Sequence, residues 1–471
     1  MRTHLNPGDS LQAEASNAFD RMPSTLHRRG LICSGVRYAT LLTLLLASAT
    51  AAALAPGADG VTVTIPISGI GDYAQAVALD PNGNFVLAGS AGGNYSVLAR
   101  LTPSGALDGT FGSGGIATHD LSLSRGDGLY ALVRMDDGRY VGCGTFSSVT
   151  TGNDFVAARF NADGSLDTTF NGVGYAVTPF GPSGPGERCN AVAVQTDGSI
   201  VSAGYTYESG PSHVALTRHS SSGQLDPTFG ISGKLNINAG TNASSNSEAR
   251  ALLIQPDGKL LIAGYAVPAS GNDDFLVMRL NTDGSLDNSF GSGGITRTPI
   301  GAGQDIANAM VRQTDSRIVL AGSVYAGGQT DFALARYSAA GVLDPTFGSG
   351  GIVTTAIGPS DDTAYALALM PWGRLVAAGS ARVTAGQSDL ALAVVAYNAD
   401  GSLDHYFGNA GKRMINLSTF NESAYGLATD ISGTRFWAVG TASPGTNQDF
   451  LAIEFGLPDT IFRDGFESMV P

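Results

Sequence analysis

Several residue types that carry binding or catalysis are scarce in this 471-residue chain. It has three lysines, six histidines, two tryptophans and three cysteines, and acidic side chains outnumber basic ones by 40 to 26. Nucleic acid binds to basic surfaces, so a net charge of −14 argues against a nucleic-acid partner. Beyond the N-terminal leader no segment shows helical periodicity, which argues against a helical fold.

Signatures of common catalytic sites are also absent from the sequence. There is no His-Glu-x-x-His zinc motif, no Gly-x-Ser-x-Gly nucleophile turn and no phosphate-binding loop ending in Lys-Ser/Thr. No cysteine and histidine cluster has zinc-site spacing. The sequence favours a non-catalytic protein and leaves the question of enzymatic activity open.

The first 51 residues have the composition of a secretory signal peptide. Basic residues at positions 28–37 precede an apolar run from Tyr38 to Ala49, and Ala49-Thr50-Ala51 fits a cleavage site. The apolar run is shorter than the ~20 residues needed to cross a bilayer. We expect an exported protein (periplasmic, cell-surface or extracellular) with no membrane span after cleavage. Translation starts at Met1 or at Met22.

Two cysteines, Cys143 and Cys189, remain after removal of this leader. Export to an oxidising compartment permits a disulfide between them. Two small buried thiols standing in for alanine are the other interpretation. Both stay open at this point, because pairing depends on a geometry that the sequence does not contain.

One phrase, Leu-Asp-x-x-Phe followed by Gly or Asn, occurs six times at a nearly constant interval. The intervals between its aspartates are 59, 59, 61, 57 and 60 residues. A fixed period of this length is typical of a repeat architecture. The phrase aspartates, which we expect to be structural repeat residues, are Asp108, Asp167, Asp226, Asp287, Asp344 and Asp404.

Each repeat contains short strand-like segments separated by turn residues. A first apolar segment ends in a hairpin turn such as Pro81-Asn82-Gly83, and a second segment follows at once and closes with glycine. An Asp/aromatic segment that usually ends in Arg, and a fourth short strand after the phrase, complete the unit. Seven closing glycines mark seven hairpins: Gly89, Gly144, Gly204, Gly264, Gly322, Gly379 and Gly440.

Four strands repeated seven times predict an all-β, seven-bladed β-propeller over residues 52–456. Six connectors join seven hairpins, so the last blade lacks a fourth strand. We expect the stretch Gly60–Ile65 to supply it beside Asp449–Phe455, which closes the ring and removes open strand edges. An open β-solenoid is the alternative, for which a repeat of about 60 residues is long. Residues 457–471 form a short C-terminal tail.

Several repeated residues have structural explanations. In five units an arginine lies eight residues before the phrase aspartate, as Arg279 does before Asp287, and we expect a charge-assisted pair that fixes the connector. The sixth unit has Ala396 before Asp404, so we expect the aspartates to cap a turn as well. The phrase phenylalanines are expected to be wedges between blades: Phe111, Phe170, Phe229, Phe290, Phe347 and Phe407.

A second set of positions, at the start of each first strand, is acidic in six of the seven units. If the first strand is innermost, these side chains form a carboxylate ring at one mouth of the central channel, where they could bind a ligand or a cation. The other interpretation, which their repetition favours, is that each accepts backbone N–H bonds within its own blade. The set is Asp72, Asp127, Glu187, Asp305, Asp362 and Glu422, with Glu248 one place after Ser247 in the fourth unit.

The positions three residues further along the chain vary. They are polar or aromatic, namely Gln75, Tyr130, Asn190, Arg250, Asn308, Tyr365 and Tyr425. A constant framework with a variable lining is typical of a ligand-binding mouth. Beside the acidic set, we therefore regard Tyr130, Arg250, Tyr365 and Tyr425 as ligand-binding candidates.

No cofactor is expected, with calcium as the exception to test. Loops such as Asn161–Asp167, repeated at Asn281–Asp287 and Asn398–Asp404, place oxygen ligands at alternating positions around a glycine, as calcium loops do. Turns held by local Asn and Asp hydrogen bonds explain the same pattern.

Residues 279–291, Arg-Leu-Asn-Thr-Asp-Gly-Ser-Leu-Asp-Asn-Ser-Phe-Gly, resemble the delta-60 repeat of bacterial exported proteins. The resemblance covers essentially all of Gly60–Phe455. It implies a propeller and implies no particular reaction. Residues 459–467 are similar to short C-terminal tails of exported proteins from some gammaproteobacteria, which would make the tail a surface or sorting element.

Two functions remain. The first is an exported, non-catalytic scaffold that binds a glycan, a peptide or a surface partner through its loop faces. The second is a propeller glycan hydrolase or lyase that uses acidic residues at the channel mouth, with or without calcium. The lack of a catalytic constellation favours the first, and fold alone does not decide between them.

Overall fold

The structure, a computed structural model, describes residues 60–122, 126–181, 186–207, 210–268, 271–386, 388–417, 421–430, 435–443, 445 and 447–457. The expected signal peptide and the tail beyond residue 457 lie outside the described residues. Within these ranges, no helix is long and apolar enough to span a bilayer.

The described residues form seven four-stranded antiparallel sheets, which are the blades of a propeller. Short, β-branched and Gly-punctuated segments favour such strands over helices. Blades 1 to 3 are β2 (Asp72–Leu79), β3 (Phe85–Ala91), β4 (Tyr95–Leu101) and β5 (Ile116–His119); β6 (Asp127–Arg134), β7 (Tyr140–Ser148), β8 (Gly152–Phe160) and β9 (Tyr175–Thr178); and β10 (Arg188–Val194), β11 (Ile200–Thr206), β12 (His213–His219) and β13 (Lys234–Ile237).

Blades 4 to 6 have the same four-strand order. They are β14 (Ser247–Ile254), β15 (Leu260–Ala266), β16 (Asp274–Leu280) and β17 (Ile295–Thr298); β18 (Asp305–Arg312), β19 (Ile318–Ala326), β20 (Gln329–Tyr337) and β21 (Ile352–Thr355); and β22 (Asp362–Leu369), β23 (Leu375–Arg382), β24 (Leu390–Tyr397) and β25 (Lys412–Ile415). A single 3-10 turn, η1 (Pro371–Gly373), stands in the hairpin of blade 6 and is the one helical element among the described residues.

The seventh blade is assembled from both ends of the described chain. It consists of β26 (Ser423–Thr429), β27 (Arg435–Ala442), β28 (Asp449–Gly456) and the N-terminal β1 (Thr62–Ile65). Strand β1 pairs antiparallel with β28, with Thr62 opposite Ile453 and Ile65 opposite Phe450. The predicted closure of the ring is confirmed, and the open β-solenoid is not observed.

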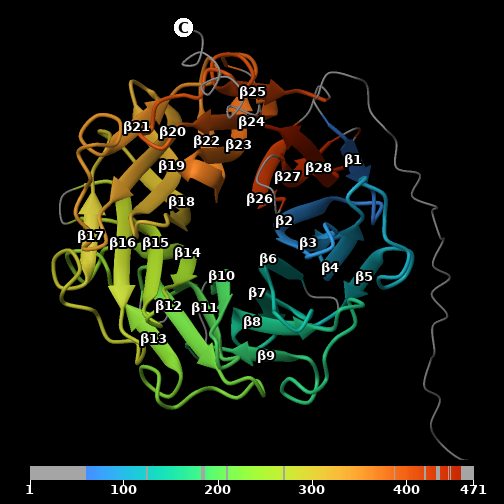
Figure 1. Cartoon of the computed structure of the whole chain (residues 1–471). Coiled ribbons are helices and arrows are strands. Elements are labelled where there is room, and N and C mark those ends of the chain that lie inside the picture. Colours follow the sequence, from blue (N-terminus) through green and yellow to red (C-terminus); the bar gives the residue numbers. More distant parts are fainter. Residues whose placement is uncertain are drawn as a thin grey trace, which may run out of the picture. The chain divides into compact units, whose positions relative to one another are not determined.

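The first strand of each blade is the innermost. In Figure 1 the strands β2, β6, β10, β14, β18, β22 and β26 lie nearest to the centre, and each contacts the first strands of the blades before and after it. Hydrophobic clusters fill the space between neighbouring blades, as where Val201, Leu216 and Phe229 of blade 3 meet Leu252 and Ile262 of blade 4. The core is therefore a ring of inter-blade layers around a central axis.

The predicted arginine–aspartate pairs hold the outer side of this ring. Arg279 Nε donates to Asp287 Oδ2 at 2.7 Å, Nη2 donates to Ser289 Oγ at 3.0 Å, and Nη1 donates to the carbonyl of Ala339 in the next blade at 2.7 Å. Its guanidinium also lies over the Phe290 ring, 4.8 Å from the centroid. One side chain thus joins its own connector to the next blade. The same contacts recur at Arg100, Arg159, Arg218 and Arg336.

The sixth blade lacks the arginine that binds the phrase aspartate in the other five units. Ala396 occupies the usual arginine position, and Asp404 forms its ion pair with Arg374 of the hairpin, as the phrase aspartates of blades 2, 4 and 5 also do with a hairpin cation. Asp404 also accepts the backbone N–H of Tyr406 at 3.2 Å, which is the expected turn cap. The phrase phenylalanines are at most 2% exposed. Phe290, for example, packs against the turn glycine Gly341 of the following blade, where a Cβ would collide with the ring.

A disulfide joins blades 2 and 3. Cys143 in β7 is bonded to Cys189 in β10, and both are fully buried. The question that the sequence left open is therefore answered in favour of pairing.

The closing glycines of the second strands are required by a close backbone approach. In blade 4, Gly264 pairs with Ala249, and a Cβ on Gly264 would overlap the carbonyl oxygen of Glu248. The same overlap with a first-strand carbonyl exists at all seven closing glycines. Any side chain at these positions would force the first strand away from the second.

Replacing Gly264 with alanine should destabilise the protein by more than about 2 kcal/mol, because the added methyl group has no space that a side-chain rotation could open. The control is Gly109→Ala, at a phrase position where a Cβ meets no atom within 4 Å. It should change stability by less than about 1 kcal/mol. Denaturant unfolding of both variants measures this, and equal midpoints would contradict the steric argument.

Candidate ligand site at the channel mouth

A β-bulge interrupts the first strand of every blade. In β14, Ala249 pairs with Gly264 and Ala251 pairs with Ala263, so Arg250 between them has no cross-strand partner. A bulge adds one residue to a strand and changes the direction of its side chain. The seven bulged residues are Gln75, Tyr130, Asn190, Arg250, Asn308, Tyr365 and Tyr425.

These seven side chains surround one cavity of about 210 Å³, to which Arg188 also contributes. Each blade supplies its bulged residue, so the cavity lies on the axis at the end where the first strands begin. The structure thus brings together all seven positions that the sequence predicts as a variable lining. None of the described residues that line it is acidic or aliphatic.

Two asparagines of the lining connect neighbouring blades. Asn190 Nδ2 donates to the carbonyl of Ala249 at 2.8 Å, and Asn308 Nδ2 donates to the carbonyl of Ala364 at 2.9 Å. Each bond crosses from one first strand to the next. These amides therefore stiffen the mouth and leave their side-chain oxygens for other contacts.

The side of the mouth formed by blades 2 to 4 carries two arginines. The guanidinium of Arg188 lies 3.7 Å from the centroid of the Tyr130 ring, and that of Arg250 lies 5.7 Å from the centroid of Tyr265. Arg250 Nη2 also binds Glu248 Oε2 at 2.9 Å. Both guanidinium groups are thus held by aromatic rings rather than left free to move.

Two tyrosines stand close together on blades 6 and 7. The rings of Tyr365 and Tyr425 are 5.0 Å apart between centroids and tilted by 44°. Burial raises the pKa of Tyr425, and the neighbouring Tyr365 raises it further. The phenol of Tyr425 is therefore a neutral hydrogen-bonding group at physiological pH.

The predicted acidic ring takes a different position. Asp305 is fully buried, and its Oδ2 accepts the backbone N–H groups of Ile300 and Gly301 at 2.7 and 2.8 Å. Those amides belong to the connector that enters the blade. Asp305 thus faces the connector, whereas Asn308, at the bulge, faces the cavity. Asp72, Asp127, Glu187 and Asp362 accept connector amides in the same way.

Blade 4 has serine at the acidic position, and blade 7 has glutamate. Ser247 takes the acceptor position, with the Ala239 N–H at 3.1 Å, and Glu248 instead pairs with Arg250. Glu422 is fully buried like the other acidic residues. The structure therefore supports the interpretation of backbone acceptors, with the donors in the entering connector. Ligand or cation binding by the acidic set stays a prediction.

The Asx-rich loops are explained by local hydrogen bonds. Asp163 Oδ1 accepts both the N–H of Ser165 at 3.0 Å and its hydroxyl at 2.6 Å, and Asn161 Nδ2 donates to Ser165 Oγ. Among the described residues no group of three or more His, Cys, Asp or Glu side chains is arranged to hold a metal ion. Calcium binding stays a prediction, to be tested by thermal unfolding with EDTA and with added calcium.

Glu187 and Asp362 of the acidic set and the phrase aspartate Asp287 have pKa values shifted in opposite directions, for different reasons. Burial raises the pKa of Glu187 to about 7 and that of Asp362 to about 6, although backbone N–H bonds act against it. Hydrogen bonds from Lys259 and Ser289 hold the pKa of Asp287 below its ordinary value. Glu187 is thus partly protonated near neutral pH, whereas Asp287 stays charged.

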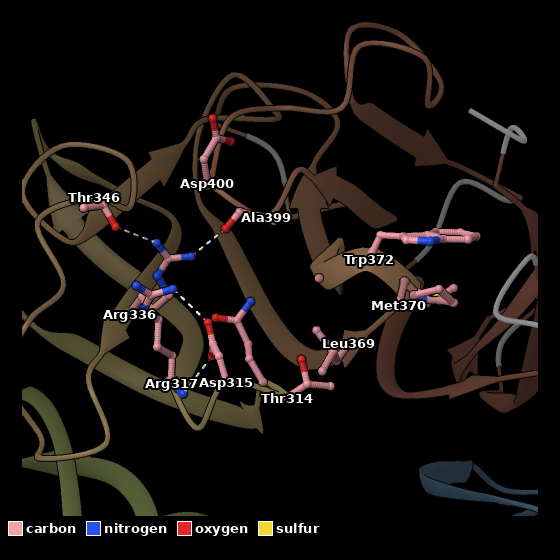
Figure 2. Close-up of a pocket in the computed structure, with 13 residues that line it drawn as sticks. Thr314, Asp315, Arg317, Arg336, Thr346, Leu369, Met370, Trp372, Ala399 and Asp400 are labelled. Carbon is pink, nitrogen blue, oxygen red and sulfur yellow. Dashed lines mark hydrogen bonds and ion pairs between the residues drawn. The ribbon is translucent and has the colours of Figure 1, made fainter. Parts of the chain in front are cut away.

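A second cavity, of about 480 Å³, lies between the hairpins of blades 5 and 6 (Figure 2). Arg317 and Arg336 lie on one side of it, and Trp372, 63% exposed, lies on the other. Arg317 binds Asp315 and Asp344, and Arg336 also binds Asp344. Because its arginines already have carboxylate partners, this cavity is the weaker candidate for a charged ligand.

Six segments of the chain match the profile of a family described as a beta-propeller domain of unknown function (DUF5122). These segments are β-propeller repeats. They cover residues 81–111, 136–170, 195–229, 255–290, 313–347 and 373–407, and each ends at the phrase phenylalanine. All seven bulged residues that line the cavity lie outside the matched segments. The family pattern therefore describes the framework and not the lining.

Solved structures match the propeller fold only distantly. Sqt1 of Chaetomium thermophilum is 12% identical with a TM-score of 0.43, covering 84% of this chain and 97% of its own. A second Sqt1 structure, bound to the N-terminus of a ribosomal protein, has the same identity and TM-score, covering 84% and 98%. The polysaccharide lyase Uly1 is 8% identical with a TM-score of 0.44, covering 83% and 91%. Likenesses at this level carry no argument about function. No curated protein matches the chain.

Arg188 is the mouth residue that our sequence reasoning missed. It lies two residues before the bulged Asn190 on β10. No repeated pattern marks this position, because the residues two places before the bulge in the other blades do not line the cavity.

The raised pKa of Glu187 predicts a pH-dependent stability. The folded pKa of about 7 lies above the ordinary 4.5, so this stabilisation is complete below about pH 4.5 and is lost as the pH rises through 7. Glu187→Gln cannot lose a proton. Its melting temperature relative to the native protein should rise between about pH 5 and about pH 8, by the equivalent of roughly 1–3 kcal/mol.

The matched control for this measurement is Asp287→Asn, at a carboxylate whose pKa is lowered. Its melting temperature should differ from that of the native protein by the same amount at both pH values. If Glu187→Gln also gave a constant difference, the buried carboxyl would not be the group that titrates.

Proposed function

We propose that this protein is an exported, non-catalytic binding protein that holds its ligand at the channel mouth. The observation that carries the proposal is the set of seven bulges. A bulge occurs in every blade, and all seven bulged residues line one cavity. These residues are of four types, namely glutamine, asparagine, arginine and tyrosine. Stability alone requires the bulge and its glycine but not this diversity, which suits ligand recognition.

Export has support from two independent features. The first is the three-part composition of residues 1–51. The second is the disulfide between Cys143 and Cys189, because disulfides persist mainly in oxidising compartments. The periplasm, the cell surface and the external medium all satisfy this condition.

The hydrolase or lyase alternative has less support. Glycoside hydrolysis ordinarily uses two carboxyl groups that flank the scissile bond. The carboxylates near the mouth are buried and bound to backbone amides or, for Glu248, to an arginine. No acidic residue in the described part of the chain lines the cavity. A binding role needs only the donors and rings that are present.

The test is a binding screen of the full chain against oligosaccharides, peptides and cell-envelope fragments, with a double variant at the mouth. Tyr365→Ala with Tyr425→Ala removes the paired rings and should weaken binding of any ligand found by at least about tenfold. Titration calorimetry gives the affinities, and thermal unfolding checks that the variant is folded.

Tyr406→Ala is the control, because Tyr406 is 60% exposed in the outer connector of blade 6. It should bind like the native protein. A ligand whose affinity fell in Tyr406→Ala but not in the double variant would place the site elsewhere on the propeller, and the proposal would be wrong.

A further inference from the structure

We infer that the channel mouth takes an acidic sugar residue, with its carboxylate on Arg188 and Arg250 and its ring against the mouth tyrosines. This inference rests on the proposed function, because it names the ligand class of the same site. It is carried by the contacts of the two arginines, by the kinds of side chain in the lining and by the size of the cavity.

Arg188 is held in place without using its hydrogen-bond donors. Its guanidinium stacks on the Tyr130 ring at 3.7 Å, and no carboxylate or carbonyl partner for it occurs among the described residues. Its Nε is buried and has no hydrogen-bond partner. A guanidinium has five N–H donors, and leaving a buried donor unpaired costs free energy. The edge of this group is therefore ready for a bidentate acceptor from outside the chain.

The free edge of Arg188 contrasts with the arginines of the outer connectors. Acidic side chains outnumber basic ones, and arginines such as Arg100, Arg279 and Arg336 each bind a carboxylate. Of the two arginines at the cavity, Arg250 has a carboxylate partner and Arg188 has none among the described residues. An anionic ligand would supply the missing partner.

Arg250 is positioned as a second donor. Glu248 takes one terminal nitrogen at 2.9 Å, which fixes the plane, while the buried Nε of Arg250 has no partner. Burial raises the pKa of the nearby Tyr205, Glu248 raises it further, and Arg188 and Arg250 lower it. Both arginines thus act on the same small region. Glu248 limits the net positive charge there, which suits a ligand with a single negative charge.

The remaining lining favours a sugar over a peptide. Apart from the arginines it consists of three amides and three tyrosines, Gln75, Asn190, Asn308, Tyr130, Tyr365 and Tyr425, with no aliphatic side chain. Amide groups bond hydroxyls, and tyrosine offers a flat apolar face with a polar end. Peptides are held mostly through strand edges and apolar side-chain pockets. A volume of about 210 Å³ is below the range of roughly 300–1,000 Å³ of sites for drug-sized ligands, and suits one sugar unit.

The experiment is titration calorimetry of the full chain with four probes. They are a galacturonate oligosaccharide, a glucuronate oligosaccharide, a neutral oligosaccharide matched to the uronate that binds more tightly, and a sulfated galactose oligosaccharide. At least one uronate should bind at least about tenfold more tightly than its neutral counterpart, and added salt should reduce that difference. Arg188→Gln should abolish the difference, and Arg188→Lys should restore only part of it, because lysine lacks the planar fork.

Arg435→Gln is the control. It removes the same charge from an arginine whose side chain is 65% exposed and paired with Glu454 on blade 7. It should bind the uronate like the native protein, and melting temperatures confirm that all variants fold.

Two results would overturn the inference and leave the proposed function standing. The first is equal binding of neutral and acidic sugars with no effect of Arg188→Gln, while the double tyrosine variant still loses binding. The second is tight binding of the sulfated sugar alone, which would make the anion a sulfate ester. Absence of binding for every sugar would also overturn the inference, and the proposed function would then be decided by the peptide and envelope probes.

Discussion

In every blade the second strand approaches the first so closely that only glycine fits at the contact. Gly264 against the carbonyl of Glu248 is one of seven such contacts. The first strand accommodates this approach with a bulge, and the bulged residue is the one that turns toward the channel. That backbone contact sets the register of the ladder between the first two strands. It also sets which residue of the first strand lies outside the ladder at the channel mouth. It also explains why the mouth positions can vary, since a residue outside the ladder has no cross-strand neighbour to match.

The outer side of the ring has the opposite character. There the arginine, the phrase aspartate and the phrase phenylalanine repeat almost without change, because each forms part of the joint to the next blade. The joint buries a ring, satisfies a carbonyl of the neighbouring blade and keeps the aspartate charged. The profile of the propeller family covers this joint and stops short of the mouth. The framework and the channel mouth are thus separated along the sequence as well as in space.

The sequence predicted the architecture well because the period states it directly. Seven closing glycines predicted seven blades, and the count of connectors placed Gly60–Ile65 in the last one. Counting from the start of each first strand also gave the seven mouth residues. The carboxylates could not be oriented in the same way, because the donors to Asp305 come from an irregular connector whose position no sequence pattern gives. The pairing of Cys143 with Cys189 needed the distance between two blades, which no local pattern contains.

The place of β1 in the seventh blade has a consequence for the order of assembly. Thr62 is among the first residues of the described chain to be synthesised, and its partner Ile453 is among the last. Six blades can form their ladders from contiguous sequence as the chain grows, but the seventh cannot. Until β28 exists, β1 has no strand to pair with, and until β1 arrives, β28 presents an open edge. A chain cut short near its C-terminus therefore loses more than its last strand, because it keeps an unpaired strand at the opposite end as well.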